Sequence, residues 1–135
     1  SILILRLSLA AVLLAHSVYL KLVVFTLAGT AGYFNSIGLP EFMAYLVFVV
    51  EAIAGVGLLL GVKSRLFALA VIPVLLGATW AHFQNGWLFT NAGGGWEYPL
   101  VLTLMAIAQL GFGDGKFSLS YYLQVKAQVN LMQED

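Results

Sequence analysis

Between residues 42 and 61 the chain reads Phe-Met-Ala-Tyr-Leu-Val-Phe-Val-Val-Glu-Ala-Ile-Ala-Gly-Val-Gly-Leu-Leu-Leu-Gly. About 20 apolar residues make a helix long enough to cross the hydrocarbon core of a bilayer. A single acid, Glu51, interrupts this run near its middle. An ionised carboxylate at that depth costs roughly 2.5–3.5 kcal/mol on insertion scales, and more when it has no partner. The run therefore predicts a membrane-spanning helix on which Glu51 faces a partner or a ligand.

The composition of the whole chain agrees with a membrane protein. Of the 135 residues, 61% are hydrophobic and 9% are charged, whereas a soluble domain carries about 25% charged residues. Mean hydropathy is +0.97. The net charge is zero, which gives no electrostatic reason to expect nucleic acid as a partner. There is no cysteine, so redox chemistry would require a bound cofactor or a partner protein.

Apolar segments long enough, or nearly long enough, to cross a bilayer occur four times. They are Ile2–Val24, Phe42–Gly61, Arg65–Ala81 and Tyr98–Phe112. The last segment is short, and Pro73 interrupts the third, where we predict a kink. The predicted fold is all-α, a bundle of four transmembrane helices that forms one domain over residues 1–120, followed by a C-terminal tail at 121–135.

The beginning of the chain has a second interpretation. The run Ile2–Ala15 is also typical of a signal-peptide core. The apolar sequence continues through His16 to Leu27, however, which favours a retained membrane-spanning helix.

The basic residues predict the orientation of the bundle. Only Lys21 lies near one side of the membrane, and the others lie near the opposite side: Arg6, Lys63, Arg65, Lys116 and Lys126. The positive-inside rule then places both termini in the cytoplasm. We expect a multi-pass protein of a bacterial-type inner (plasma) membrane, in contact with membrane lipid.

Polar residues of this predicted bundle gather in its outer half. His16 and Glu51 lie at the same depth, about 12–14 Å below the outer interface at 1.5 Å per residue. A His16–Glu51 hydrogen bond or ion pair is therefore the simplest expectation, and Lys21 can extend outward or toward Glu51. Each residue alone also has a structural explanation: His82 bonded to a loop carbonyl, Glu97 in a helix first turn, Lys21 at the interface, and His16 with Glu51 as a pair that fixes register. Taken together, they favour a binding pocket.

The loop before the fourth segment is rich in aromatic residues and glycine. The aromatic side chains are typical of an interfacial belt, but the loop can instead fold over a pocket. Its sequence Asn91-Ala-Gly-Gly-Gly-Trp-Glu97 favours the second interpretation, since consecutive glycines permit positive φ and close approach of the backbone. Gly57 and Gly61 form a GxxxG pattern and Gly55 precedes it, which predicts tight helix packing.

Several stretches together resemble the DoxX family of small four-helix membrane proteins over roughly residues 5–120. They are Arg6, His16 followed by Lys21, Phe34 with Gly38-Leu-Pro40, Glu51-Ala-Ile-Ala-Gly55, Leu58-Leu-Leu-Gly-Val-Lys-Ser-Arg65, His82, Asn91-Ala-Gly-Gly-Gly-Trp-Glu-Tyr-Pro99 and Gly113-Asp-Gly-Lys-Phe-Ser-Leu119. Ser17 departs from the pattern, because the family usually has glycine after the histidine, and predicts a looser helix contact there.

The resemblance implies a redox role. Members of the family are associated with membrane oxidoreductases, including a subunit of a thiosulfate:quinone oxidoreductase, and with thiol-redox and superoxide-detoxifying assemblies. We therefore expect the membrane subunit of a redox complex, which anchors it or interacts with quinone, with no intrinsic cofactor and no metal site. A quinone needs an apolar slot and groups that deliver protons. The catalytic candidates are Glu51, His16 and His82, and the candidate quinone-binding residues are His16, Lys21, Glu51, Trp80, His82, Trp96 and Glu97.

The main alternative is a non-catalytic scaffold that helps a larger membrane complex to assemble. Both hypotheses require a protein partner and neither requires nucleic acid. A bis-histidine heme between His16 and His82 is disfavoured, because helix rise separates the two in depth by roughly 10 Å. A metal site that also used Glu51 and Glu97 meets the same difficulty. Four helices without broken segments are also few for a transporter.

Overall fold

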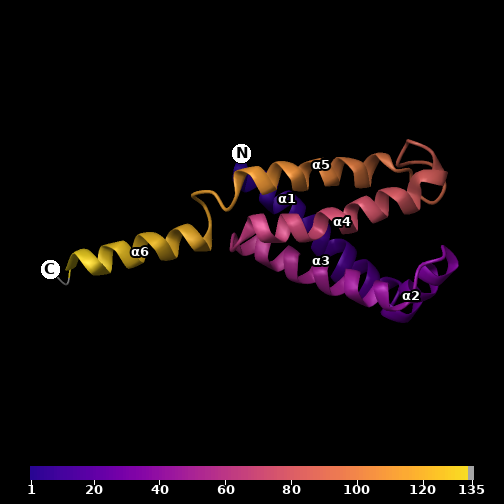
Figure 1. Ribbon diagram of the computed structural model, residues 1–135, viewed down its shortest axis with the longest axis horizontal. Helices are drawn as coiled ribbons and strands as arrows, with labels where there is room; N and C mark the ends of the chain where they lie inside the picture. The colour runs from indigo at the N-terminus through magenta and orange to yellow at the C-terminus, as the bar shows by residue number, and fades with distance from the viewer. Residues whose placement is uncertain (134–135) are drawn as a thin grey trace.

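The computed structural model describes residues 1–133, and its regular elements are all helical (Figure 1). In chain order they are α1 (Ile2–Leu14), the π-helix η1 (Ala15–Val24), α2 (Leu27–Ser36), α3 (Phe42–Leu60), α4 (Ser64–His82), the 3₁₀-helix η2 (Phe83–Asn85), α5 (Glu97–Phe112) and α6 (Leu119–Gln133). Within the described residues no strand forms. The all-α prediction is therefore confirmed.

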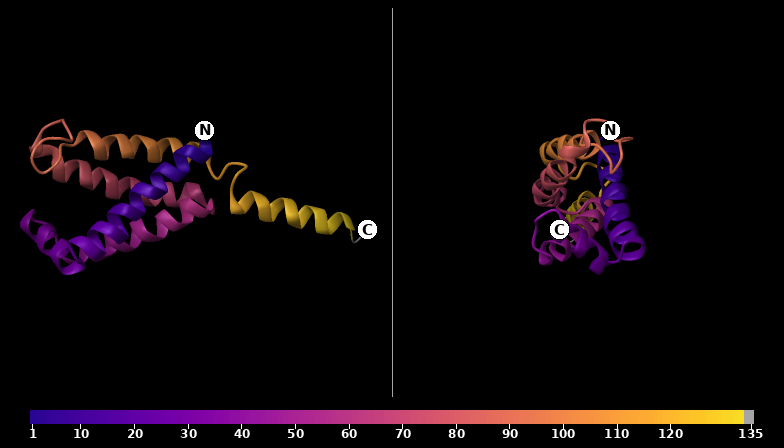
Figure 2. Two further views of the ribbon diagram at one scale, coloured as in Figure 1. Left: turned by 180° about the vertical axis from the view of Figure 1, so that it is seen from behind. Right: turned by 90° about the vertical axis from the view of Figure 1, so that its right-hand side faces the viewer.

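Four long elements build the bundle. The continuous helix α1–η1 packs against α3, α3 packs against α4, α4 packs against α5, and α5 returns to α1. Figure 2 shows these helices around a common axis in its right-hand view. Apolar side chains from all four helices meet in the core: Leu9, Leu13, Ala54, Leu58, Val71, Leu75, Leu102 and Ala106.

Three helices are long and apolar enough to cross a membrane. They cover Ile2–Val24, Phe42–Leu60 and Ser64–Asn85, close to the first three predicted spans. Between 17% and 33% of each apolar segment is buried inside the bundle, so most of the apolar surface faces outward, as contact with lipid requires. The fourth segment, α5, has 16 residues. The fourth span and the placement of the termini in the cytoplasm remain predictions.

Small residues let neighbouring helices approach closely. A Cβ atom added to Gly55 would lie 2.7 Å from the Leu14 side chain of α1. One added to Gly57 would lie 2.0 Å from the Phe67 ring of α4. The tight packing predicted from these glycines is confirmed, although side chains rather than backbone fill the space that they leave.

Two helices lie outside the four predicted spans. The first, α2, lies between the first two spans and begins after Thr26, whose hydroxyl accepts a hydrogen bond from Gly29 N–H at 3.1 Å. This N-cap satisfies a backbone donor of the first turn. The second helix, α6, covers Leu119–Gln133 and so most of the predicted tail, and it extends away from the bundle (Figure 1). The last two tail residues, 134 and 135, lie outside the described part of the chain.

Candidate functional site

Glu51 faces a lysine in the interior of the bundle. Lys21 Nζ lies 2.7 Å from Glu51 Oε2, with side-chain exposures of 16% and 7%. Lys21 Nζ also lies 3.5 Å from the carbonyl oxygen of His16. The expectation that Glu51 needs a partner is confirmed, but the expected His16–Glu51 pair is wrong, because Lys21 takes that position. We refer to His16, Lys21 and Glu51 as the outer ion-pair group.

The direction of the His16 side chain explains the difference. Its Nδ1 lies 2.9 Å from the carbonyl oxygen of Val12 on the same helix, and its ring centre lies 6.2 Å from that of Tyr98 on α5. His16 belongs to the π-helix, whose i→i+5 hydrogen bonds change the rotation from one residue to the next. Depth alone therefore did not predict which side chain faces α3.

The ten-residue π-helix is itself unusual. π-Helices are rare and mostly occur as single turns, frequently at functional sites. Here η1 carries both His16 and Lys21. Ser17 between them is fully buried, and its hydroxyl donates a hydrogen bond to the carbonyl of Leu13 at 2.7 Å. The hydroxyl of Ser17 is thus satisfied within its own helix, and the looser helix contact expected at Ser17 stays a prediction.

The loop between α4 and α5 holds a second set of candidate residues. His82 Nδ1 lies 2.8 Å from the carbonyl oxygen of Ala78 in its own helix, not from the loop carbonyl expected for it. Glu97 Oε2 accepts a hydrogen bond from Phe89 N–H at 3.2 Å. Trp96 stacks on the ring of Phe83 with 5.4 Å between ring centres. We refer to His82, Trp96 and Glu97 as the loop group.

The glycines of this loop have the backbone roles that the sequence predicted. Gly93 and Gly94 adopt φ values of +78° and +79°, which side chains rarely permit. Gly95 is buried, and a Cβ atom there would lie 2.2 Å from the carbonyl oxygen of Leu88. A Cβ atom on Gly94 would lie 3.6 Å from the His82 ring. The loop thus folds back on itself and lies against His82.

The structure therefore places the predicted site residues other than Trp80 in two separate groups. Lys21 and Glu51 are in direct contact, whereas His82, Trp96 and Glu97 belong to the packing of the loop. Trp80 is 58% exposed. Within residues 1–133 no three His, Asp or Glu side chains come close enough together to hold a metal ion. The outer ion-pair group is the part of the predicted site with charged groups buried in the apolar interior.

Sequence reasoning missed a second polar region, at the opposite end of the bundle. Arg6 is 2% exposed. Its guanidinium donates hydrogen bonds to the carbonyls of Leu58 and Leu59, the latter at 2.9 Å, and to the carbonyl of Phe117. The carbonyls at the end of α3 have no partner within that helix, so Arg6 satisfies them from α1. The only signal for this role was a lone arginine in the first apolar span.

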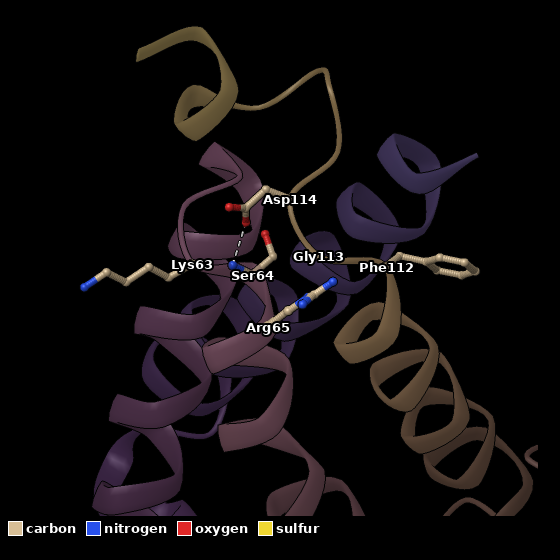
Figure 3. A pocket seen from close by; sticks show the side chains of 6 residues that line it. All are labelled: Lys63, Ser64, Arg65, Phe112, Gly113 and Asp114. Carbon is tan, nitrogen blue, oxygen red and sulfur yellow. Dashed lines mark hydrogen bonds between the residues drawn. The ribbon is translucent and has the colours of Figure 1, made fainter. Parts of the chain in front are cut away.

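Asp114 performs a similar function at the start of α4. Its Oδ1 accepts a hydrogen bond from Ser64 N–H at 2.7 Å (Figure 3). Burial alone would raise the pKa of the Asp114 carboxyl, but the side chain and backbone of Ser64, the Ser120 side chain and the charge of Arg6 act in the opposite direction. The pKa of Asp114 therefore lies below its usual value. We refer to Arg6, Ser64 and Asp114 as the basic-end cluster.

Two hollows lie near this end of the molecule. One, of about 290 Å³, is lined by Lys63, Ser64, Arg65, Phe112, Gly113 and Asp114 (Figure 3). The other, of about 460 Å³, is almost entirely apolar and is lined by Ala52, Ile53, Val56, Gly57, Leu60, Val62 and Phe67. The first combines cationic and aromatic groups, and the second only hydrocarbon.

The apolar outer faces of the helices, together with a buried ion pair between two of them, define a helical membrane protein. The chain belongs to the DoxX family, which it matches over residues 1–84. The matched residues include the outer ion-pair group and His82, and they end before the Asn91–Pro99 stretch.

A Bacillus subtilis (strain 168) protein with the name "Putative oxidoreductase CatD" is 35% identical to the chain over 83 residues. The match covers 62% of this chain and 60% of that protein. The chain thus spans less than two thirds of the length of this relative. No solved structure matches the chain.

Proposed function

We propose that this protein is the membrane subunit of a redox complex, in which the outer ion-pair group interacts with a quinone or stabilises the anchoring bundle. The buried Lys21–Glu51 pair carries the proposal. An ion pair in an apolar interior costs several kcal/mol of desolvation per ion, and apolar residues of similar volume would suit a purely lipid-embedded helix better. Ionisable residues inside membrane spans are therefore functional candidates by default. The DoxX family and the name of the Bacillus relative support the redox assignment.

The chemistry of the group suits a quinone. Reduction of a quinone carbonyl consumes protons, which a carboxyl, ammonium or imidazole group can supply when it lies within hydrogen-bond distance. Lys21 already donates a hydrogen bond to Glu51, and the ring centre of His16, on the same helix as Lys21, lies 6.2 Å from that of Tyr98. Electrons would come from a partner protein. Trp80 and Trp96 remain candidates for stacking on the quinone ring.

Quinone binding tests the proposal directly. A short-tailed quinone is titrated into the purified full chain in detergent, and quenching of tryptophan fluorescence reports its binding. We expect Glu51→Gln to weaken binding, since the amide removes the charge and the exchangeable acid. Glu41→Gln is the matched control, because Glu41 is exposed at the start of α3. Equal affinity in wild type and Glu51→Gln would remove Glu51 from quinone recognition.

The double variant Lys21→Met/Glu51→Leu separates chemistry from structure. Replacing both members of a buried pair with apolar residues is often neutral for stability or stabilising. If the pair serves quinone binding, the double variant folds normally but binds quinone weakly. Normal binding by the double variant would show that the pair only stabilises the bundle.

A scaffold role is the second candidate, and α6 favours it. This helix extends away from the bundle (Figure 1), and its side chains are almost all exposed, including Leu131 and Met132 at 65% and 71%. A subunit of this kind would use α6 to bind a neighbouring protein. A variant without residues 119–135 distinguishes the two roles. In the scaffold case it should no longer assemble with its partner on native gels of solubilised membranes, while its quinone binding should remain intact.

A further inference from the structure

We propose that the hollow between the start of α4 and the end of α5 binds the phosphate headgroup of an anionic phospholipid. Its lining residues include two cations, Lys63 and Arg65, and Phe112. Cationic pockets between transmembrane helices are typical binding sites for anionic lipid headgroups. This proposal is independent of the quinone hypothesis, which concerns the opposite half of the bundle.

The hollow lies at the level of the headgroups. Lys63 ends the tight turn between α3 and α4, Ser64 begins α4, and each of these helices is long and apolar enough to cross a membrane. The turn must therefore lie at a membrane surface. This placement holds whichever side of the membrane the turn faces.

Arg65 is the principal phosphate ligand. One guanidinium nitrogen, Nη2, donates a hydrogen bond to the carbonyl of Gly111 at 3.2 Å. No other hydrogen bond and no carboxylate within 4.0 Å occupies this guanidinium among residues 1–133. An arginine presents five N–H donors in a planar fork that matches phosphate geometry. Most of these donors are thus available to an anion in the hollow.

Lys63 contributes charge rather than a direct contact. Figure 3 shows its side chain extending to the opposite side from Arg65, with Ser64 and Asp114 between them. Asp114 also lines the hollow, and one of its oxygens accepts the Ser64 N–H. Its single negative charge is outnumbered by the two positive charges of Lys63 and Arg65.

Phe112 argues for a lipid rather than a free phosphate. Phe112 lines the hollow and is 58% exposed, and Figure 3 shows its ring extending outward, away from Arg65. An exposed ring at the rim of a cationic hollow suits a ligand whose phosphate continues into glycerol and hydrocarbon. Inorganic phosphate would gain nothing from this ring.

The full chain is equilibrated in mixed micelles with equal amounts of phosphatidylglycerol and phosphatidylcholine. Native mass spectrometry then measures which of the two lipids the protein retains. We expect the wild type to retain phosphatidylglycerol preferentially. Arg65→Gln should reduce this preference about fivefold, the equivalent of about 1 kcal/mol for one basic residue near a membrane surface. Arg65→Lys should reduce it less, since charge remains and only the fork is lost. Lys63→Asn, which tolerates the positive φ of 49° at this position, should have the smaller effect of a distant charge.

Lys126→Gln is the matched control, because it removes one positive charge from α6, away from the hollow. Equal losses in Lys126→Gln and Arg65→Gln would show a diffuse surface effect and overturn the site. Equal retention of the two lipids by the wild type would also overturn it. Displacement of phosphatidylglycerol by inorganic phosphate would overturn the assignment to a lipid and identify a soluble anion as the ligand. Far-UV circular dichroism checks that each variant remains folded.

Discussion

The two buried polar regions of this bundle satisfy their charges in different ways. In the outer ion-pair group, one charged side chain meets another, Lys21 against Glu51 at 2.7 Å. In the basic-end cluster, charged side chains meet mainly backbone: Arg6 donates to three carbonyls, and Asp114 accepts from Ser64 N–H. The backbone groups at helix ends need partners in any case. The ion pair has no such need, since both of its members could be apolar without leaving a backbone group unsatisfied.

This difference indicates that the basic-end cluster serves stability and the outer ion-pair group serves ligand binding. The basic-end cluster connects α1, the end of α3, the start of α4 and the connection to α6, so its polar groups stabilise the fold. The outer ion-pair group connects η1 and α3, which also pack against each other elsewhere along their length. We therefore expect substitutions at Arg6 to reduce stability most, and substitutions of the ion pair to affect ligand binding more than stability.

Replacement of Arg6 gives the largest expected effect on stability. Arg6→Ala removes a donor from the carbonyls of Leu58, Leu59 and Phe117, of which Leu58 keeps its hydrogen bond from Gly61 N–H at 3.2 Å. A buried polar group without a partner costs about 1–3 kcal/mol, and the loss of a buried long side chain leaves a cavity, so the total loss should be about 3 kcal/mol. Thermal unfolding in detergent, followed by circular dichroism, measures the loss. Lys126→Ala on the exposed helix α6 should unfold like the wild type, and a similar result for Arg6→Ala would contradict the structural role of the cluster.

Single substitutions in the ion pair should reduce the free energy of unfolding less than Arg6→Ala does, and their effects should not add in the double variant. Breaking a fully buried pair costs roughly 3–5 kcal/mol, but Lys21 remains partly exposed, so we expect about 2 kcal/mol for Lys21→Met or Glu51→Leu alone. The double variant should recover most of this loss, because neither charge is left unpaired. A double-mutant cycle of unfolding free energies in detergent measures the coupling. Additive losses in the double variant would mean that each side chain stabilises the bundle through contacts other than the pair.

The two regions also differ in how far the sequence predicts them. Hydropathy was sufficient for the first three spans, and the isolated charge of Glu51 marked it as a residue that needs a partner. The predicted partner of Glu51, His16, was wrong because the π-helix changes the positions of His16 and Lys21 around the helix axis. Spacing along a regular helix does not predict this change. Arg6 was missed because its partners are carbonyls, and every residue type has one. The resemblance to the DoxX family likewise came from short motifs, of which only those before residue 85 lie in the matched region.

Acid should weaken the basic-end cluster selectively, through Asp114. The pKa of this carboxyl lies below its usual value in the folded protein, so at acidic pH the unfolded chain binds more protons than the folded one, and stability rises with pH. The contribution of Asp114 is therefore complete above the unfolded pKa of about 3.9 and disappears as the pH falls through the folded pKa. A charged hydrogen bond is worth roughly 1.5–3 kcal/mol. Because Asp114 is only partly buried, we expect about 1 kcal/mol after solvent screening.

Comparison with Asp114→Asn isolates this effect from the titration of other carboxyls. At neutral pH the variant should unfold at a lower temperature than the wild type, because the neutral amide oxygen is a weaker acceptor for Ser64 and Ser120 and carries no charge opposite to that of Arg6. Below the folded pKa the two proteins should unfold at nearly the same temperature, since protonated Asp114 has also lost its charge. A difference that stayed constant from neutral to acidic pH would mean that Asp114 stabilises the start of α4 by hydrogen-bond geometry alone. The charge of Arg6 would then be balanced by its three carbonyls without Asp114.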